Sequence, residues 1–114
     1  MKPRLLIVDD DPAIRESLEE RFQSREYHVR SAGSGREAVE AARLGVDVVL
    51  LDLQLPEGDG LWVLREFEKE SVSATVIVIT AHGSVERAVE AMQLGAYDFL
   101  EKPFEAARLE EAVA

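Results

Sequence analysis

The chain has 114 residues, enough for one domain with a sizeable core and too few for two. Hydrophobic residues make up 46% of it and cysteine is absent, so we expect a globular protein without disulfides or thiolate metal sites. The net charge of −10 disfavours direct binding to nucleic acid. The lack of a long apolar run disfavours a membrane span, and we expect a cytoplasmic location.

The first predicted strand is residues 4–8, an apolar run that leads directly into Asp9, Asp10 and Asp11. Pro12 suits the first position of a helix, with Asp11 as its N-cap. The buried stripe of this helix should recur every four residues, at Ile14, Leu18 and Phe22.

The next strand and helix are predicted within residues 27–45. Residues 27–32 alternate between apolar and polar, which is typical of a strand near a sheet edge. Residues 34–37 form a capping box that opens a helix, and Gly45 should end it. This helix is expected to run through Ala38, Val39, Ala42 and Leu44.

The third strand, residues 48–52, is apolar up to Asp52 and therefore indicates a central strand buried on both faces. A turn rich in Gly and Pro follows, in which Asp59 is expected as a cap or turn residue. A helix over residues 60–69 should bury Leu61, Leu64 and Phe67.

Two further strands and two helices complete the chain. Residues 75–80 predict another doubly buried strand, and residues 97–100 a short last one. Between them Ser84 should cap a helix that Gly95 closes. The inward residues of that helix are expected to be Val85, Ala88, Val89 and Met92. The final helix should carry Ala106, Leu109 and Val113.

Five strands that alternate with five helices predict right-handed crossovers and a parallel sheet. The fold class is therefore α/β, a doubly wound five-stranded parallel sheet with helices on both faces. In such sheets ligands bind just outside the carboxyl ends of the strands, so the residues at those ends are the candidates for function.

Polar groups follow four of the predicted strands: Asp9 and Asp10, Asp52, Thr80 and Lys102. Taken alone, Asp52 is more simply explained as a cap of the turn that follows it. The repetition of the pattern at the other strand ends favours a shared site.

Three carboxylates in one place repel one another, so at least one of them should have a raised pKa unless a cation sits among them. Magnesium fits best, because it is held by one or two carboxylates together with water and phosphate oxygens. Zinc is disfavoured, since there is no Cys and neither His28 nor His82 has metal-ligand spacing. An unpaired Lys102 beside such an ion suggests a phosphoryl group, and Asp52 is a suitable nucleophile for it.

Residues 8–11, 50–56, 79–81 and 102–104 carry these side chains in a characteristic order. Together they resemble the receiver domain of two-component response regulators, and the likeness covers essentially the whole chain. It implies a flavodoxin-like strand order of 2-1-3-4-5. Residues 81–84 and 96–102 are also similar to the nitrogen-regulator-like subgroup, whose receivers are fused to sigma-54-activating ATPase and DNA-binding domains.

The resemblance implies a role for each residue at the strand ends. Asp52 would be the phospho-acceptor, and Asp9 and Asp10 the acidic pair. Mg2+ would be ligated by Asp10, Asp52 and the backbone carbonyl of Gln54, with Asp9 acting mainly through water.

Three further roles follow from the same likeness. Thr80 and Lys102 would contact the phosphoryl group, and Phe99 would be the switch aromatic that responds to it. The bond between Lys102 and Pro103 would be cis.

The implied partners are a sensor histidine kinase and a C-terminal output domain that controls transcription. Self-association into a homodimer is also open, whereas direct contact with nucleic acid or a membrane is not expected. Residues 1–114 would be one receiver domain excised from a longer regulator, because the last predicted helix is short and lacks a Gly or Pro stop. No turnover substrate is expected, so the chain would not be an enzyme in the ordinary sense.

Three other functions can be compared with the pattern. A haloacid-dehalogenase-type phosphatase also uses a nucleophilic Asp, Mg2+, Thr or Ser, and Lys. It places a second Asp two residues after the nucleophile, where this chain has Gln54, and no cap-domain insertion is present. A phosphorylation-independent docking domain would not need the intact set of polar residues, and a dinucleotide-binding domain would need a Gly-rich loop after the first strand.

Overall fold

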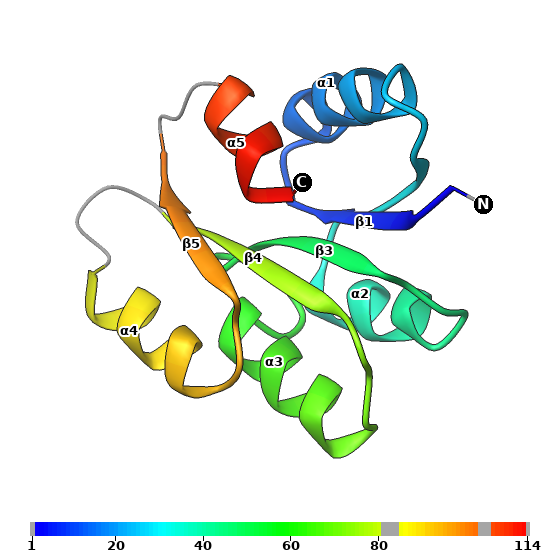
Figure 1. The fold of residues 1–114 in the computed structure, drawn as a ribbon. Helices are drawn as coiled ribbons and strands as arrows, with labels where there is room; N and C mark the ends of the chain where they lie inside the picture. The colour runs from blue at the N-terminus through cyan, green and yellow to red at the C-terminus, as the bar shows by residue number, and fades with distance from the viewer. Residues whose placement is uncertain (1, 81–84, 103–105, 114) are drawn as a thin grey trace.

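The computed structural model describes residues 2–80, 85–102 and 106–113, which form five strands and five helices in alternation (Figure 1). The strands are β1 (Arg4–Val8), β2 (His28–Ala32), β3 (Val48–Asp52), β4 (Thr75–Thr80) and β5 (Asp98–Glu101). All pairs are parallel, and the order in the sheet is β2-β1-β3-β4-β5. The predicted fold class and strand order are confirmed.

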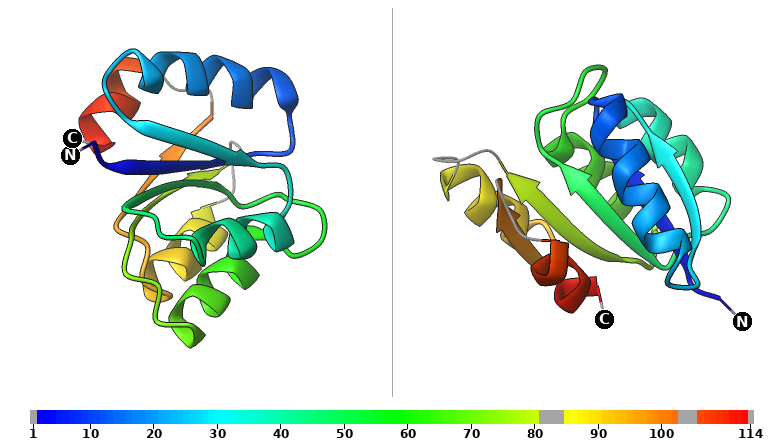
Figure 2. Two further views of the ribbon diagram at one scale, coloured as in Figure 1. Left: turned by 90° about the vertical axis from the view of Figure 1, so that its right-hand side faces the viewer. Right: turned by 90° about the horizontal axis from the view of Figure 1, so that it is seen from above.

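The helices cover both faces of the sheet, as Figure 2 shows from the side. They are α1 (Pro12–Gln23), α2 (Gly35–Ala42), α3 (Gly60–Lys69), α4 (Val85–Gln93) and α5 (Ala106–Val113). Helices α1 and α5 lie on one face, and α2, α3 and α4 lie on the other. This arrangement leaves the carboxyl ends of the central strands open for a site.

Each face of the sheet has its own apolar core, because successive strand residues point to opposite faces. In β1, Leu5 and Ile7 pack toward α1 and α5, while Leu6 and Val8 pack toward α2 and α3. Full burial of one such side chain stabilises the fold by roughly 1.5–3 kcal/mol. β1, β3 and β4 are buried on both sides, which explains why their sequences show no polar alternation.

The helix starts follow the predicted caps. Asp11, Ser34 and Asp59 each accept a hydrogen bond from a backbone N–H in the first turn of the helix that follows. One detail of the capping box differs: the Glu37 carboxylate accepts from the Gly33 N–H at 2.8 Å instead of from the N–H of Ser34. The box therefore also fixes the turn that precedes α2.

Helix α2 is shorter than predicted. It ends at Ala42, and Leu44 lies beyond it with 73% of its surface exposed. Gly45 closes this segment in the left-handed region, with φ +100°, and its N–H donates to the Ala42 carbonyl at 3.0 Å. The helix is thus stopped two residues earlier than its apolar pattern suggested.

The inward face of α4 was predicted only in part: the burial of Ala88 is confirmed, but the inward positions of Val89 and Met92 are wrong. Val89 is 50% exposed and Met92 38% exposed, whereas Ala88 and Ala91 are buried against the sheet. At 3.6 residues per turn, a stripe through Ala88 and Ala91 turns Val89 well away from the core and leaves Met92 at its margin. Ser84 and the side chains of Val85 and Ala106, for which the sequence also made predictions, lie outside the described residues.

The last strand is displaced by one residue from its predicted position. The N–H of Tyr97 donates to the Val76 carbonyl at 2.8 Å, but β5 begins at Asp98 and the Tyr97 side chain is 68% exposed. Likewise Tyr27 precedes β2 and packs edge-on against Phe22, with ring centroids 5.5 Å apart. Both differences lie at strand ends, where propensity alone sets boundaries poorly.

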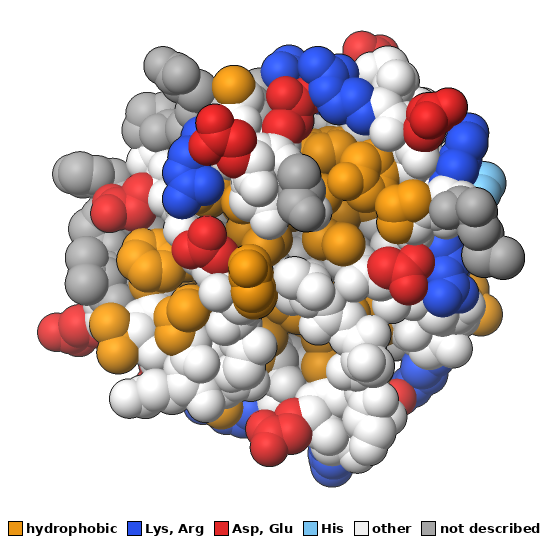
Figure 3. All heavy atoms as spheres, viewed as in Figure 1, with side chains coloured by type: hydrophobic (Ala, Val, Ile, Leu, Met, Phe, Trp, Pro, Cys, Tyr) orange, Lys and Arg blue, Asp and Glu red, His pale blue; other side chains and the backbone are white. Residues whose placement is uncertain are grey.

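Figure 3 shows apolar side chains near the centre of one face and charged side chains scattered around them. In the part of the chain that the structure describes, no helix combines the length and apolar character needed to cross a membrane.

Candidate functional site at the carboxyl end of the sheet

Asp9 is held rigidly where β1 ends. It is 2% exposed, and its N–H continues the ladder by donating to the Ala32 carbonyl at 3.1 Å. Its side-chain Oδ1 accepts from the Asp11 N–H at 2.9 Å, and its carbonyl accepts from Arg15 Nη1 at 2.7 Å. The neighbouring Asp10 is exposed. The acidic pair therefore consists of one fixed, buried carboxylate and one that faces solvent.

Asp52 is the last residue of β3 and is 4% exposed. Its Oδ1 accepts from the Gln54 N–H at 2.9 Å, so it does cap the following turn. Its Oδ2 accepts from Lys102 Nζ at 2.8 Å. Capping and site formation are thus compatible, because each oxygen of the carboxylate takes a different partner.

Lys102 bridges the two buried carboxylates. Its Nζ lies 3.1 Å from Asp9 Oδ2 and 2.8 Å from Asp52 Oδ2. The sequence pattern predicted an unpaired lysine here, and this expectation is wrong for the structure described. Buried carboxylates need a countercharge, and the ammonium supplies it.

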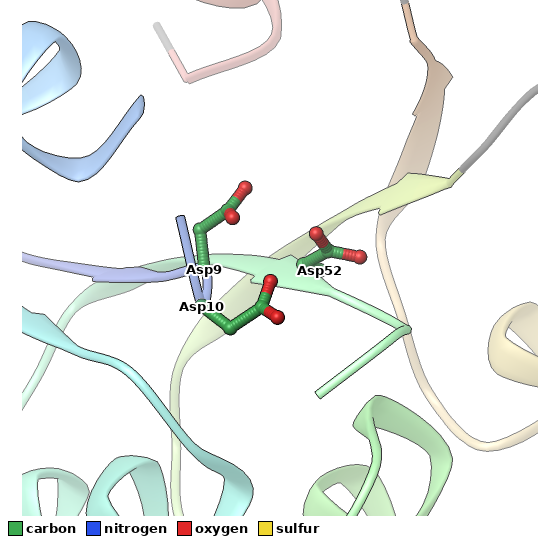
Figure 4. Close-up of side chains that lie close together, drawn as sticks. All are labelled: Asp9, Asp10 and Asp52. Atoms are coloured by element: carbon green, nitrogen blue, oxygen red, sulfur yellow. The ribbon is translucent and has the colours of Figure 1, made fainter. Parts of the chain in front are cut away.

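The three carboxylates gather in one place. Ligand atoms from Asp9, Asp10 and Asp52 lie within 4.8 Å of one another, and Figure 4 shows their side chains projecting from the ends of β1 and β3 into a common space. The donor set is entirely oxygen, and Asp10 is exposed to solvent. A hard divalent cation that keeps several waters, such as Mg2+, fits this chemistry.

Burial raises the pKa of the Asp52 carboxyl above its usual range. The hydrogen bonds from Lys102 and Gln54 act in the opposite direction, and the charge of Asp9 adds to the rise. The predicted raised carboxyl pKa is confirmed, but desolvation causes most of it and repulsion between carboxylates causes less.

Burial lowers the pKa of Lys102, but hydrogen bonds and charge interactions with Asp52 and Asp9 outweigh it and leave the pKa raised. The two buried carboxylates therefore favour the charged form of Lys102.

The other predicted residues stand as follows. Thr80 ends β4 beside Glu101 of β5, but its side chain lies outside the described residues. So do Pro103, with the predicted cis bond, and Phe104. Phe99 is half-buried and packs against the core on the α2–α4 face of the sheet.

The loop that joins β3 to α3, residues 53–59, is anchored by contacts that the sequence did not predict. The N–H of Gly35 donates to Pro56 O at 3.1 Å, and the N–H of Arg36 donates to Glu57 O at 2.9 Å. A Cβ on Gly35 would lie 1.7 Å from the Gly58 carbonyl oxygen. Only glycine permits this approach, and a single sequence carries no signal for it.

A doubly wound parallel sheet with an acidic cluster and a lysine at its carboxyl edge defines the class of this protein. The family model for the response regulator receiver domain matches residues 5–114. The chain therefore belongs to the response regulator receiver domain family, whose general properties are phosphotransfer and conformational switching. The predicted resemblance is confirmed.

Relatives and solved structures agree with this assignment. The response regulator protein PilR of Pseudomonas aeruginosa is 41% identical over 99% of this chain and 26% of its own length. The regulatory protein AtoC of Escherichia coli is 40% identical over 90% of this chain and 22% of its own length. This chain thus spans about a quarter of the length of each of these two relatives.

Among solved structures, NtrX from Brucella abortus aligns with a TM-score of 0.90 and 35% identity, covering 99% of this chain and 26% of that chain. A response regulator receiver protein from Pseudomonas putida aligns with a TM-score of 0.88 and 30% identity, covering 99% and 96%. Family membership overturns the alternative of a haloacid-dehalogenase-type phosphatase.

Proposed function

We propose that the chain is a phosphorylation-activated switch that accepts a phosphoryl group from a histidine kinase onto Asp52. The observation that carries this proposal is the position of Asp52. It is buried at the end of β3, accepts hydrogen bonds from the Gln54 N–H and from Lys102 Nζ, and lies beside two further carboxylates. Carboxylates of this kind form acyl phosphates.

Asp52, Lys102 and Thr80 have different roles in the phosphoryl transfer. An Asp52 oxygen attacks the phosphorus of a phosphohistidine or a small acyl phosphate, and the bond from phosphorus to the leaving group breaks. Lys102, already 2.8 Å from Asp52 Oδ2, stays close to the incoming phosphoryl oxygens and offsets their charge. Thr80, at the end of β4, would donate its hydroxyl to the phosphoryl group.

Asp10, Asp52 and the Gln54 carbonyl would hold Mg2+, with Asp9 acting through water. Mg2+ would supply charge neutralisation on the transferring phosphoryl oxygens. The support is the oxygen-only cluster of Asp9, Asp10 and Asp52.

The test is incubation with acetyl phosphate and Mg2+. The parent should gain one phosphoryl group that hydroxylamine removes, and Asp52→Asn should gain none. Asp11→Asn is the matched control, because it changes an exposed carboxylate near the site and keeps an oxygen for the α1 cap. Labelling of Asp52→Asn at the parent's yield would move the acceptor elsewhere.

We further propose that phosphorylation is relayed through Thr80 and Phe99 to the surface formed by α4 and β5. The half-buried Phe99 supports this, since it reaches both the core and the molecular surface. Beryllofluoride, a phosphoryl mimic, should change amide exchange in α4 and β5 or the oligomeric state. If beryllofluoride occupies the site and changes neither the amide exchange nor the oligomeric state, the proposed relay through Thr80 and Phe99 is wrong.

The output is proposed from the relatives. PilR and AtoC are far longer than this chain and are regulators of the sigma-54-activator type, which supports a C-terminal output domain controlling transcription, of the ATPase and DNA-binding kind. In this proposal residues 1–114 are the receiver unit, without a turnover substrate of their own. Fusion to a candidate output domain and a reporter assay with and without the kinase would test it; output unchanged by Asp52→Asn would contradict it.

A further inference from the structure

Arg87 of α4 reaches across to both ends of the loop formed by residues 53–59. Its Nη2 donates to the Leu53 carbonyl at 3.3 Å and to Asp59 Oδ2 at 3.1 Å. Helices α3 and α4 lie side by side on the same face of the sheet, so the arginine spans the gap between α4 and the loop (Figure 1). One guanidinium therefore connects α4 to the start and the end of this loop.

The two acceptors are placed where the loop meets the site and where it meets α3. Leu53 stands between Asp52 and Gln54, and its carbonyl also accepts from the Gly60 N–H at 3.0 Å. Asp59 uses its other oxygen to cap α3, by accepting from the Trp62 N–H at 2.9 Å. Movement of α4 away from the loop would thus loosen the backbone next to Asp52.

A second ion pair between the same helices provides a contrast. Arg65 of α3 lies 3.7 Å from Glu90 of α4, with side chains 54% and 48% exposed. Arg87 is less exposed, at 34%, and bonds a backbone carbonyl as well as a carboxylate. Exposed ion pairs contribute little, whereas a charged donor on a backbone carbonyl constrains the backbone itself.

We propose that Arg87 is a positioning residue that sets the backbone beside Asp52 and couples it to α4. The proposal rests on the proposed function, because it takes residues 52–54 as part of the Mg2+ and phosphoryl site. In this arrangement, loss of the contact between Arg87 and the loop of residues 53–59 lowers the Mg2+ affinity of the site. By linkage, Mg2+ binding strengthens that contact by the same free energy.

The experiment compares Arg87→Gln with Arg65→Gln. Arg87→Gln should weaken Mg2+ binding by about three- to fivefold, the size of one partly exposed charged contact, measured by calorimetry on the folded protein. Without metal, it should also speed amide exchange in residues 53–59 and in α4 together. Arg65→Gln should leave the Mg2+ affinity and exchange of the loop at the parent's values.

Two further variants separate positioning from general stability. Asp59→Asn keeps an oxygen for the α3 cap but removes the charge facing Arg87, so it should weaken Mg2+ binding less than Arg87→Gln does. The double variant with both Arg87→Gln and Asp59→Asn should bind Mg2+ no more weakly than Arg87→Gln alone, because Arg87 and Asp59 act through one contact. Arg87→Lys, which keeps a charged donor, should recover part of the affinity.

Asp10→Asn distinguishes failure of this inference from failure of the proposed function. If Asp10→Asn binds Mg2+ as the parent does, the proposed site itself is wrong. If Asp10→Asn loses Mg2+ while Arg87→Gln and Arg65→Gln both match the parent, the site stands and the positioning role of Arg87 is overturned. Equal weakening by Arg87→Gln and Arg65→Gln would also overturn it.

Discussion

Lys102 holds two buried carboxylates together through one ammonium group, with Asp9 and Asp52 both within hydrogen-bonding distance. At the scale of single residues, this contact decides how the buried carboxylates are stabilised. Repulsion among acids is a smaller effect than the cost of burying Asp52, which raises its pKa. The sequence placed these residues at one edge, but the pairing of Lys102 depends on side-chain geometry that a linear pattern does not contain.

Replacing Lys102 should show how much the burial of Asp9 and Asp52 costs in stability when their ammonium partner is missing. Lys102→Met leaves two buried carboxylates without their ammonium and should destabilise the metal-free protein by about 2–4 kcal/mol, near the range for a broken buried pair. Mg2+ should recover more stability in this variant than in the parent. Urea unfolding with and without Mg2+ measures both effects. Lys69→Met is the control. Lys69 is exposed and forms an ion pair with Glu66, three residues earlier in the same helix, so its replacement should change the free energy of unfolding little.

The raised pKa of Asp52 predicts a pH dependence with a definite sign. A group whose folded pKa is raised stabilises the fold below its unfolded pKa, and this contribution is lost as pH rises through the folded pKa. Without metal, Asp52→Asn should therefore melt above the parent at neutral pH. The difference should shrink as the buffer is acidified below the folded pKa. A difference that is constant with pH would contradict the prediction.

At the scale of elements, the loop of residues 53–59 connects the site to three helices. The first turn of α2 donates backbone hydrogen bonds to Pro56 and Glu57, α3 begins at its end, and Arg87 reaches it from α4. Helix starts were predictable because Asp11, Ser34 and Asp59 act locally as caps. The inward face of α4 was predictable only at Ala88, because the small side chain of Ala91 is buried in place of the larger Val89 and Met92.

Gly35→Ala tests the close approach of α2 to this loop. The added Cβ would meet the Gly58 carbonyl oxygen at 1.7 Å, so α2 or the loop must shift, at a cost of about 1–3 kcal/mol as in an overpacked core. Gly33→Ala is the control, since its Cβ meets the end of the flexible Arg15 side chain at 2.9 Å. Thermal unfolding of both variants should show the larger loss of melting temperature for Gly35→Ala. Equal melting temperatures would contradict a steric role for the close approach of Gly35 to the loop.

At the scale of the whole molecule, the alternation of strands and helices determines where function resides. Consecutive apolar runs at β1, β3 and β4 predicted a parallel sheet, and parallel strands bring their carboxyl ends to one edge. That reasoning assembled Asp9, Asp10, Asp52 and Lys102 from segments far apart in the sequence. Contacts of helices with the loop of residues 53–59, such as those of Gly35 and Arg87, were not predictable because they depend on how elements pack.

The central claim is that Asp52 accepts the phosphoryl group, and chemical trapping tests it most directly. Borohydride reduces an acyl phosphate of aspartate to homoserine, so the protein treated with acetyl phosphate and Mg2+ should carry homoserine at position 52 in peptide mass spectra. Asp9 and Asp10, on a different peptide of the same sample, should remain aspartate. Homoserine at either of those positions, or phosphorylated protein that yields none at position 52, would contradict the account.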